Sequence, residues 1–280
     1  MTTSLPSLFI SHGSPMTALE PGEAGAFWSR LGPAIDATFG RPRAILALSA
    51  HSLSRSPVLL AAARHEAVHD FGGFPQALFD LRYPAAGAPA LADQVQALMA
   101  AAGLPVHRHE GGGLDHGIWA PLRWIYPRGD VPVLPLAWPP GATPAALMAL
   151  GQALAPLRDQ GVLILGTGAI THNLGLFQAA GRVLNAPERP ESAAFRQWMA
   201  ERTQAGDWTA LQAWRTQAPH GAFMHPTDEH LLPWFIAAGA AGPTPTGERL
   251  HASVEYGHLG MDAYAFGAEA AALRQALGGA

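Results

Sequence analysis

The 280-residue sequence contains no cysteine, and because its seventeen basic residues are all arginine it contains no lysine either. The lack of cysteine excludes disulfides, thiolate nucleophiles, iron–sulfur clusters and cysteine-ligated zinc. The lack of lysine excludes Schiff-base chemistry, lysine-anchored pyridoxal phosphate and the phosphate-binding lysine of a P-loop. Thirteen histidines remain, which makes imidazole the leading candidate for chemistry, as a metal ligand or as an acid and base.

Charge and long apolar runs are also scarce. Charged residues make up 14% of the chain, the formal net charge is −4, and no cluster of basic residues occurs, which argues against nucleic acid or a membrane surface as a partner. No window holds eighteen uninterrupted apolar residues, and the first residues lack the charged and apolar regions of a signal peptide. We therefore expect a soluble, cytoplasmic protein.

Short apolar runs bounded by glycine or proline alternate with longer amphipathic segments along the whole chain. This alternation is typical of α/β folds, and apolar strands covered by helices imply a sheet buried on both faces. We expect one domain over residues 1–280, an α/β/α sandwich around a largely buried central mixed sheet. The expected strands are 8–11, 44–50, 58–62, 131–137 and 162–166, with a further strand pair in 252–256 and 261–266; the expected helices are 89–101, 118–126, 144–159, 191–203, 208–216, 229–238 and 268–277, with N-caps at Ser192, Asp207 and Thr227.

Three strand-like runs lead directly into a histidine. These are His12, His51 and His172, the last after a short Thr-Gly-containing extension. In open α/β sheets, ligands bind in the crevice beyond the carboxyl ends of the strands. Any one of these histidines alone would usually be structural, but three of them at strand ends predict imidazoles that converge on one site.

Two further segments carry candidate residues. His116 lies in a glycine-flanked turn, where Asp115 could simply cap the following helix and His116 could be a surface residue. Glu229 and His230 follow Thr227, so they are expected in the first turn of a helix. A carboxylate is common there as a cap, whereas a charged imidazole is disfavoured, and a neutral, metal-bound His230 fits the position.

Six short motifs occur along nearly the whole chain, at residues 9–16 (FISHGSPM), 48–51 (LSAH), 69–75 (HDFGGFP), 114–117 (LDHG), 172–174 (HNL) and 226–233 (PTDEHLLP). In this order they resemble the class III extradiol ring-cleavage dioxygenases, in particular the DOPA-dioxygenase-like branch. The sequence departs from this branch at Ser52, where an aromatic residue is usual, and at Asp228, where proline is usual. Ser52 would widen the pocket, so the departure bears on the substrate more than on the reaction.

The resemblance implies a metal held by His12, His51 and His230, with His116 and His172 beside the metal but outside its ligand set. Some relatives use a carboxylate as third ligand, so Glu229 is the alternative to His230.

The chemistry of a catechol and O₂ then suggests His172 as the base and His116 as the acid, although the two roles are interchangeable at this stage. Aromatic residues 69–75 form either a loop over the substrate or a turn packed on Phe71 and Phe74. The residues expected to contact substrate are His69, Phe71, Tyr256 and His258.

The implied activity is Fe(II)-dependent extradiol opening of a DOPA-like catechol by O₂ to a muconic semialdehyde. Zn²⁺ suits three imidazoles as well as Fe(II) does and binds more tightly in the divalent series, so zinc is a second expected occupant of the isolated protein. Two alternatives are a zinc hydrolase, weakened by the lack of a His-Glu-x-x-His motif, and a non-catalytic metal-binding protein of the same fold. The second is weakened by the two histidines outside the ligand set, which a binding protein would not need.

Overall fold

A mixed sheet of eight strands forms the centre of the protein. The computed structural model describes residues 4–179 and 183–278. The strands of the sheet are β1 (Ser7–Ser11), β2 (Ala44–Ser49), β3 (Val58–Leu60), β6 (His107–His109), β7 (Val133–Ala137), β8 (Val162–Gly168), β9 (Gly247–His251) and β12 (Ala263–Phe266), in the order β6-β3-β7-β2-β8-β1-β12-β9. The central strands β7, β2, β8 and β1 are parallel to their neighbours in this run, whereas β12 is antiparallel to both β1 and β9.

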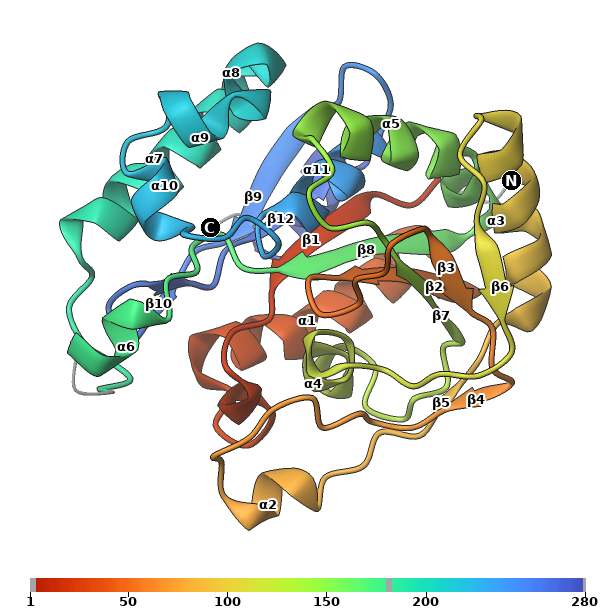
Figure 1. Ribbon diagram of the computed structural model, residues 1–280, viewed down its shortest axis with the longest axis horizontal. Helices are drawn as coiled ribbons and strands as arrows, with labels where there is room; N and C mark the ends of the chain where they lie inside the picture. The colour runs from red at the N-terminus through yellow and green to blue at the C-terminus, as the bar shows by residue number, and fades with distance from the viewer. Residues whose placement is uncertain (1–3, 180–182, 279–280) are drawn as a thin grey trace.

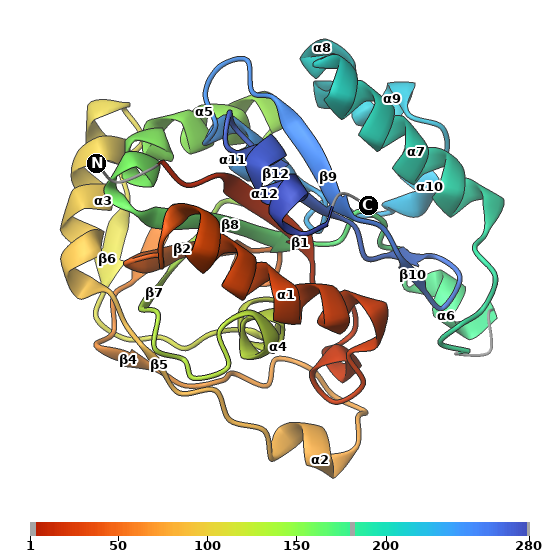
Figure 2. The same ribbon diagram turned by 180° about the vertical axis from the view of Figure 1, so that it is seen from behind.

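Helices cover both faces of this sheet. In Figure 2, α1 and α12 lie in front of the sheet. The helices are α1 (Gly22–Phe39), α2 (Gln76–Phe79), α3 (Pro89–Ala101), α4 (His116–Ile125), α5 (Pro144–Leu154), α6 (Gly175–Ala179), α7 (Pro190–Ala205), α8 (Trp208–Gln212), α9 (Trp214–Gln217), α10 (Gly221–Met224), α11 (Leu232–Gly239) and α12 (Ala270–Ala276), with short 3₁₀ turns at Pro15–Ala18 and Ala155–Gln160. Among the described residues, no helix is both long enough and apolar enough to cross a membrane.

Alternate residues of the central strands enter two separate cores. Leu163 and Leu165 of β8 pack with α1, α4 and α12, whereas Ile164 between them packs with α3, α5 and α11. This two-residue period is what a strand buried on both faces produces. The expected α/β/α sandwich with a buried mixed sheet is therefore confirmed, and Figure 1 shows its helices around the strands.

The five single strands expected from the apolar runs are all present, with ends that shift by a few residues. The expected pairing of 252–256 with 261–266 is wrong. Ala263–Phe266 pairs with Gly247–His251, a strand that the sequence did not reveal, while β10 (Val254–Glu255) forms its own ladder with β11 (Leu259–Gly260). A second small ladder joins β4 (Arg64–His65) to β5 (Ala85–Ala86). The turn at residues 256–258, which contains Gly257, closes the short β10–β11 hairpin before the chain returns to the main sheet.

The helix predicted from residue 229 begins later, at Leu232. Pro233 occupies its first turn, a position that suits proline because the amide of the first turn has no partner within the helix. Thr227, Glu229 and His230 therefore lie in the preceding turn, and Thr227 is not an N-cap. The cap expected at Ser192 is also wrong, because α7 already begins at Pro190 and the Ser192 hydroxyl donates to Glu188. Asp207 caps α8 as predicted.

The long helix α1 was not expected from the sequence, because glycines and Pro33 interrupt its apolar pattern. Its buried stripe of Phe27, Trp28, Leu31 and Ile35 nevertheless packs on the sheet. Gly32 is needed for this packing, because a Cβ there would lie 2.1 Å from the carbonyl oxygen of Ile125 in α4. The glycine thus serves a close approach of two helices and does not end the helix.

Glycine also controls how the turn that carries His230 approaches β8. The Ala169 amide donates to the His230 carbonyl at 2.8 Å, and a Cβ on Gly168 would lie 2.0 Å from that same oxygen. The strand and the turn can contact each other this closely only because residue 168 has no side chain.

We expect Gly168→Ala to lower the free energy of unfolding by about 1–3 kcal/mol, the usual range for an overpacked interior. Urea unfolding is the measurement, and Gly72→Ala is the control, because a Cβ at Gly72 would meet nothing within 4 Å. Equal stability of the two variants would contradict the close approach.

Candidate metal centre and active site

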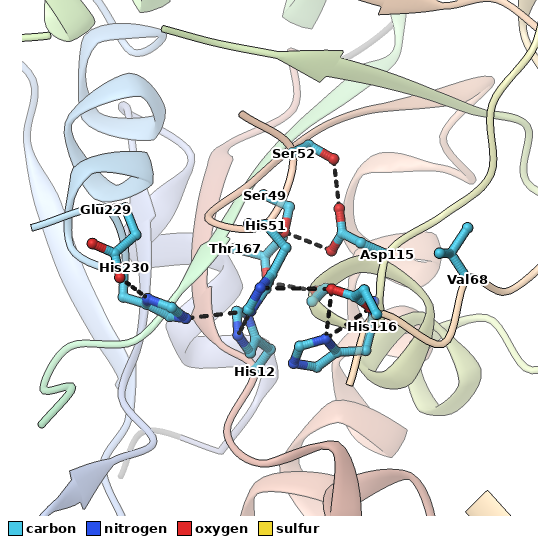
Figure 3. A network of polar contacts seen from close by, with 12 residues as sticks. His12, Ser49, His51, Ser52, Val68, Asp115, His116, Thr167, Glu229 and His230 are labelled. Carbon is cyan, nitrogen blue, oxygen red and sulfur yellow. Dashed lines mark hydrogen bonds and ion pairs between the residues drawn. The ribbon is translucent and has the colours of Figure 1, made fainter. Parts of the chain in front are cut away.

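Five histidines from separate parts of the chain meet at the carboxyl ends of the central strands. His12 directly follows β1 and His51 follows β2, while His172 comes after the end of β8. His116 opens α4, and His230 lies in the turn before α11 (Figure 3). The expected convergence of imidazoles at the strand ends is therefore present, and it includes both histidines from the other two segments.

The His51 ring lies at the centre of this group. Its centroid is 5.0 Å from that of His12, 4.9 Å from that of His230 and 4.1 Å from that of His116. His172 lies at the outer side of His230, where the two rings stack with centroids 3.5 Å apart and planes 9° apart.

Three ring nitrogens of this group approach one another closely. His12 Nε2 lies 3.2 Å from His51 Nε2, and His51 Nε2 lies 3.3 Å from His230 Nε2. At such distances a proton or a cation has to stand between each pair of nitrogens.

Hydrogen bonds on the opposite ring edges determine which nitrogens carry protons. The Thr167 hydroxyl donates to the Gly117 carbonyl at 2.6 Å, so it accepts from His12 Nδ1 at 3.0 Å. His230 Nδ1 donates to the Glu229 carboxylate at 2.9 Å. The neutral His12 and His230 rings therefore both present an unprotonated Nε2.

A divalent cation fits this donor set. His51 can carry at most one proton on Nε2, and that proton can form a hydrogen bond with only one of the two neighbouring nitrogens. The lone pair of the other neighbouring nitrogen would remain without a donor. His51 Nδ1 also lies 3.6 Å from an Asp70 carboxylate oxygen, which favours the proton on Nδ1. His51 Nε2 then faces an unprotonated nitrogen on each side, and a metal ion would satisfy these lone pairs. Among the described residues, two adjoining groups of side chains here could hold an ion: His12, His51 and His116, and His172, Glu229 and His230.

Burial keeps these imidazoles neutral. It lowers the pKa of His12 well below its ordinary value, and the neighbouring imidazoles lower it further. Burial, followed by His116 and His230, lowers the pKa of His51 to about 3. Burial also lowers the pKa of His230, although the hydrogen bond to Glu229 opposes it. Neutral imidazole is the form that binds metal, so near neutral pH these three histidines are in the form that a metal ion needs.

Carboxylates surround the cluster without reaching its centre. Glu229 accepts from His230 Nδ1, on the ring edge opposite the converging nitrogens, so its position suits orienting His230 more than replacing it. The hydrogen bond to His230, partly opposed by burial, lowers the pKa of Glu229 to about 2.

Asp115 does not cap α4 with its side chain, which corrects one expectation from the sequence. Its carboxylate instead accepts from the Ser49 hydroxyl at 2.7 Å and from the Ser52 hydroxyl at 2.5 Å (Figure 3). The backbone amide of His116 donates to Asp70 at 2.9 Å. Ser52, which departs from the usual family pattern, is thus part of a buried hydrogen-bond network.

The residues expected to contact substrate lie in aromatic clusters on two sides. The His69 ring lies 5.7 Å from that of Phe71 and 5.6 Å from that of Trp119, and Phe71 approaches His116 edge-on at 5.6 Å. Phe71 also packs on Phe74, as in the packed-turn interpretation of residues 69–75.

On the other side, Tyr256 and His258 each contact Phe177, with ring centroids 4.8 Å apart. Contact of these four residues with a substrate stays a prediction.

Two supporting residues had no assigned role from the sequence. His225 is buried, and its Nε2 donates to the Ile170 carbonyl at 2.9 Å, two residues before His172. Thr167 lies within β8, and nothing in its sequence surroundings indicates that it fixes the His12 tautomer. Asp70 also contacts a histidine of the cluster. Its position next to His69 in the glycine-rich motif 69–75 was the signal in the sequence that could have pointed to it.

Comparison with known proteins agrees with this geometry. Residues 6–267 match the family described as the catalytic LigB subunit of aromatic ring-opening dioxygenases. The chain is 35% identical over 263 residues to a Beta vulgaris protein named 4,5-DOPA dioxygenase extradiol, covering 93% of this chain and 96% of that protein. The chain belongs to the LigB family.

Further relatives of this LigB-family chain include an Escherichia coli K12 protein also named 4,5-DOPA dioxygenase extradiol, 34% identical over 241 residues, with 85% of this chain and 86% of that protein covered. The crystal structure of an uncharacterized Escherichia coli K12 protein matches with a TM-score of 0.72 at 26% identity, covering 93% of this chain and 99% of that chain.

Membership makes the protein an extradiol aromatic ring-opening dioxygenase that acts on an aromatic substrate and O₂. Dioxygenases of this family are metal-dependent, in agreement with the histidine cluster. The expectations of family, fold and enzyme class are thus confirmed.

We expect His12→Ala, His51→Ala and His230→Ala each to lose most of the bound metal, since each removes one of the converging nitrogens. Glu229→Gln should keep one metal per chain with affinity about 10-fold to 100-fold weaker, the usual effect of changing a group that orients a ligand. Metal content and a competition titration measure both effects. Full metal retention in His230→Ala, with loss in Glu229→Gln, would make Glu229 the third ligand.

Proposed function

We propose that this LigB-family enzyme opens a DOPA-like catechol with O₂ next to its two hydroxyls, using Fe(II) held by His12, His51 and His230, and releases a muconic semialdehyde. The observation that carries the proposal is the meeting of three unprotonated Nε2 atoms with two further imidazoles beside them. The names of the Beta vulgaris and Escherichia coli relatives support a substrate of the DOPA type.

Fe(II), when bound, supplies the electron transfer that lets O₂ react with a catechol, which Zn²⁺ cannot supply because it has no accessible redox change. The protein's own task is to take protons from the two hydroxyls and to hold the diol in place. Two imidazoles lie outside the proposed ligand set, those of His116 and His172, so one is present for each of the two hydroxyls.

We assign His172 as the base that accepts the proton of the first catechol hydroxyl. Burial, followed by the His230 ring, lowers the pKa of His172 to about 2, so its ring is neutral and has one unprotonated nitrogen that can accept a hydrogen bond from a catechol hydroxyl. Its place is fixed by backbone, because the His172 amide donates to the Met224 carbonyl at 3.0 Å. A hydroxyl that has given up its proton binds a metal ion more strongly, so this transfer would favour chelation.

We assign His116 as the residue that accepts the proton of the second catechol hydroxyl. It opens α4 on the other side of His51, so the two acid–base imidazoles flank the proposed ligands from opposite sides. His116 would then return its proton to the O₂-derived oxygen that is released when the O–O bond breaks.

The metal requirement gives a direct prediction. The Fe(II)-loaded protein should consume O₂ with a catechol such as DOPA and form a yellow semialdehyde, whereas a matched Zn²⁺ sample should not. Oxygen uptake by samples of known metal content is the measurement. Equal turnover by the zinc form, or failure of the iron form with every catechol tried, would contradict the proposal and would reopen the hydrolase and binding-protein alternatives.

The proposed role of His172 as a base gives a second prediction. We expect His172→Phe to keep the metal and to lose about 10²-fold to 10⁴-fold in turnover, the usual cost of removing an acid–base group. His220→Phe is a control, because His220 lies outside the cluster. An unchanged rate at saturating catechol in His172→Phe would remove this residue from the reaction.

A further inference from the structure

Asp70 contacts both a proposed metal ligand and a proposed acid–base histidine. Both of its oxygens lie 3.0 Å from His116 Nδ1, and one of them also accepts from the His116 backbone amide at 2.9 Å. Its second oxygen lies 3.6 Å from His51 Nδ1. The carboxylate thus makes three short contacts with His116, two to the ring and one to the backbone amide, and a longer one with His51.

This arrangement determines where the His116 proton resides. An ionised carboxylate only accepts hydrogen bonds, so His116 Nδ1 must carry the proton and donate it to Asp70. The other ring nitrogen, Nε2, is then without a proton. The ring itself lies beside those of His12 and His51, with centroids 5.3 Å and 4.1 Å away (Figure 3).

The segment that carries Asp70 is held in place from both sides. The Val68 amide donates to the Leu114 carbonyl at 2.7 Å, two residues before His116, and the Trp119 indole donates to the Val68 carbonyl at 3.0 Å. Next to Asp70, the Phe71 ring meets His116 edge-on. The carboxylate and the imidazole are therefore anchored to the same end of α4, which keeps their contact fixed.

We propose that Asp70 is a positioning residue that holds His116 in the Nδ1–H tautomer, so that His116 Nε2 accepts a proton from the substrate and later returns it. The proposal rests on the proposed role of His116 in the ring-opening reaction. It adds the residue that makes that role feasible.

The proton balance follows from the tautomer. In the resting enzyme Nε2 has no proton to donate, so His116 first takes one from a catechol hydroxyl. The resulting imidazolium carries a proton on each ring nitrogen and is stabilised by the Asp70 carboxylate. It then gives the Nε2 proton to the O₂-derived oxygen that is released when the O–O bond breaks, and the resting tautomer is restored without any other proton source.

The test is Asp70→Asn, because asparagine keeps the shape and can still accept from the His116 amide. Its side-chain amide would donate to His116 Nδ1 and shift the proton to Nε2. Long-range proton–nitrogen NMR of ¹⁵N-histidine-labelled, Zn²⁺-loaded protein reads the tautomer directly, with His116→Gln identifying the signals. We expect the proton on Nδ1 in the unaltered protein and on Nε2 in the variant.

Kinetics provide the second readout. With Fe(II), kcat of Asp70→Asn should fall about 10²-fold to 10⁴-fold, while KM for the catechol and the metal content change little. Asp80→Asn, at an exposed carboxylate bonded to Gln76, is the matched control for charge and should match the unaltered enzyme.

Three outcomes would overturn the proposal: a proton on His116 Nε2 in the unaltered protein, a full rate in Asp70→Asn, or metal loss in that variant with the tautomer unchanged. The last outcome would mean that Asp70 acts through His51. The NMR measurement needs no turnover, so it decides the tautomer even where the iron enzyme fails with every catechol.

Discussion

The close approach of three unprotonated imidazole nitrogens is the constraint on which the site depends. His12 and His230 each direct an Nε2 lone pair at His51 Nε2, at 3.2 Å and 3.3 Å. Without a cation these lone pairs repel, and the proposed metal ion would remove that repulsion. Metal binding would then stabilise the folded state, because the unfolded chain has no such site.

The rings of His12 and His230 are each fixed by a hydrogen-bond acceptor on the opposite edge, Thr167 and Glu229, and glycines allow the backbone to approach these rings closely. Gly117 lies where a Cβ would be 2.6 Å from Ser49 Oγ and 2.9 Å from His12 Nδ1. Gly168 similarly allows the end of β8 to lie against the His230 carbonyl, and the same strand contains Thr167. The geometry of the metal centre is thus determined by small residues in β8 and α4 as much as by the histidines themselves.

The sequence was sufficient for the architecture and for the histidines because both follow local patterns. A buried strand that ends in histidine is visible as an apolar run, and the parallel order of such strands brings their ends together. The start of α11 was misplaced because Thr227 resembles a cap, whereas Pro233 sets the first turn. Helix α1 was missed because Gly32 and Pro33 resemble breakers, although Gly32 serves a contact with α4.

The supporting side chains could not be predicted in the same way. Thr167 lies 155 residues from His12 and Asp70 lies 46 residues from His116, so their hydrogen bonds depend on the folded arrangement alone. The same is true of Asp115, whose carboxylate bonds two serines of the strand end beside His51, where the sequence suggested only a helix cap. Roles that rest on long-range contacts appear only once the strands and α4 are in place.

The convergence of His12, His51 and His230 on one metal ion is the central claim, and anomalous X-ray diffraction from crystals of the metal-loaded protein tests it most directly. We predict one ion per chain at about 2.0–2.2 Å from the three Nε2 atoms, with Glu229 hydrogen-bonded to His230 and away from the ion. An ion bound by Glu229 in place of His230, or one that lies apart from the three nitrogens, would contradict it.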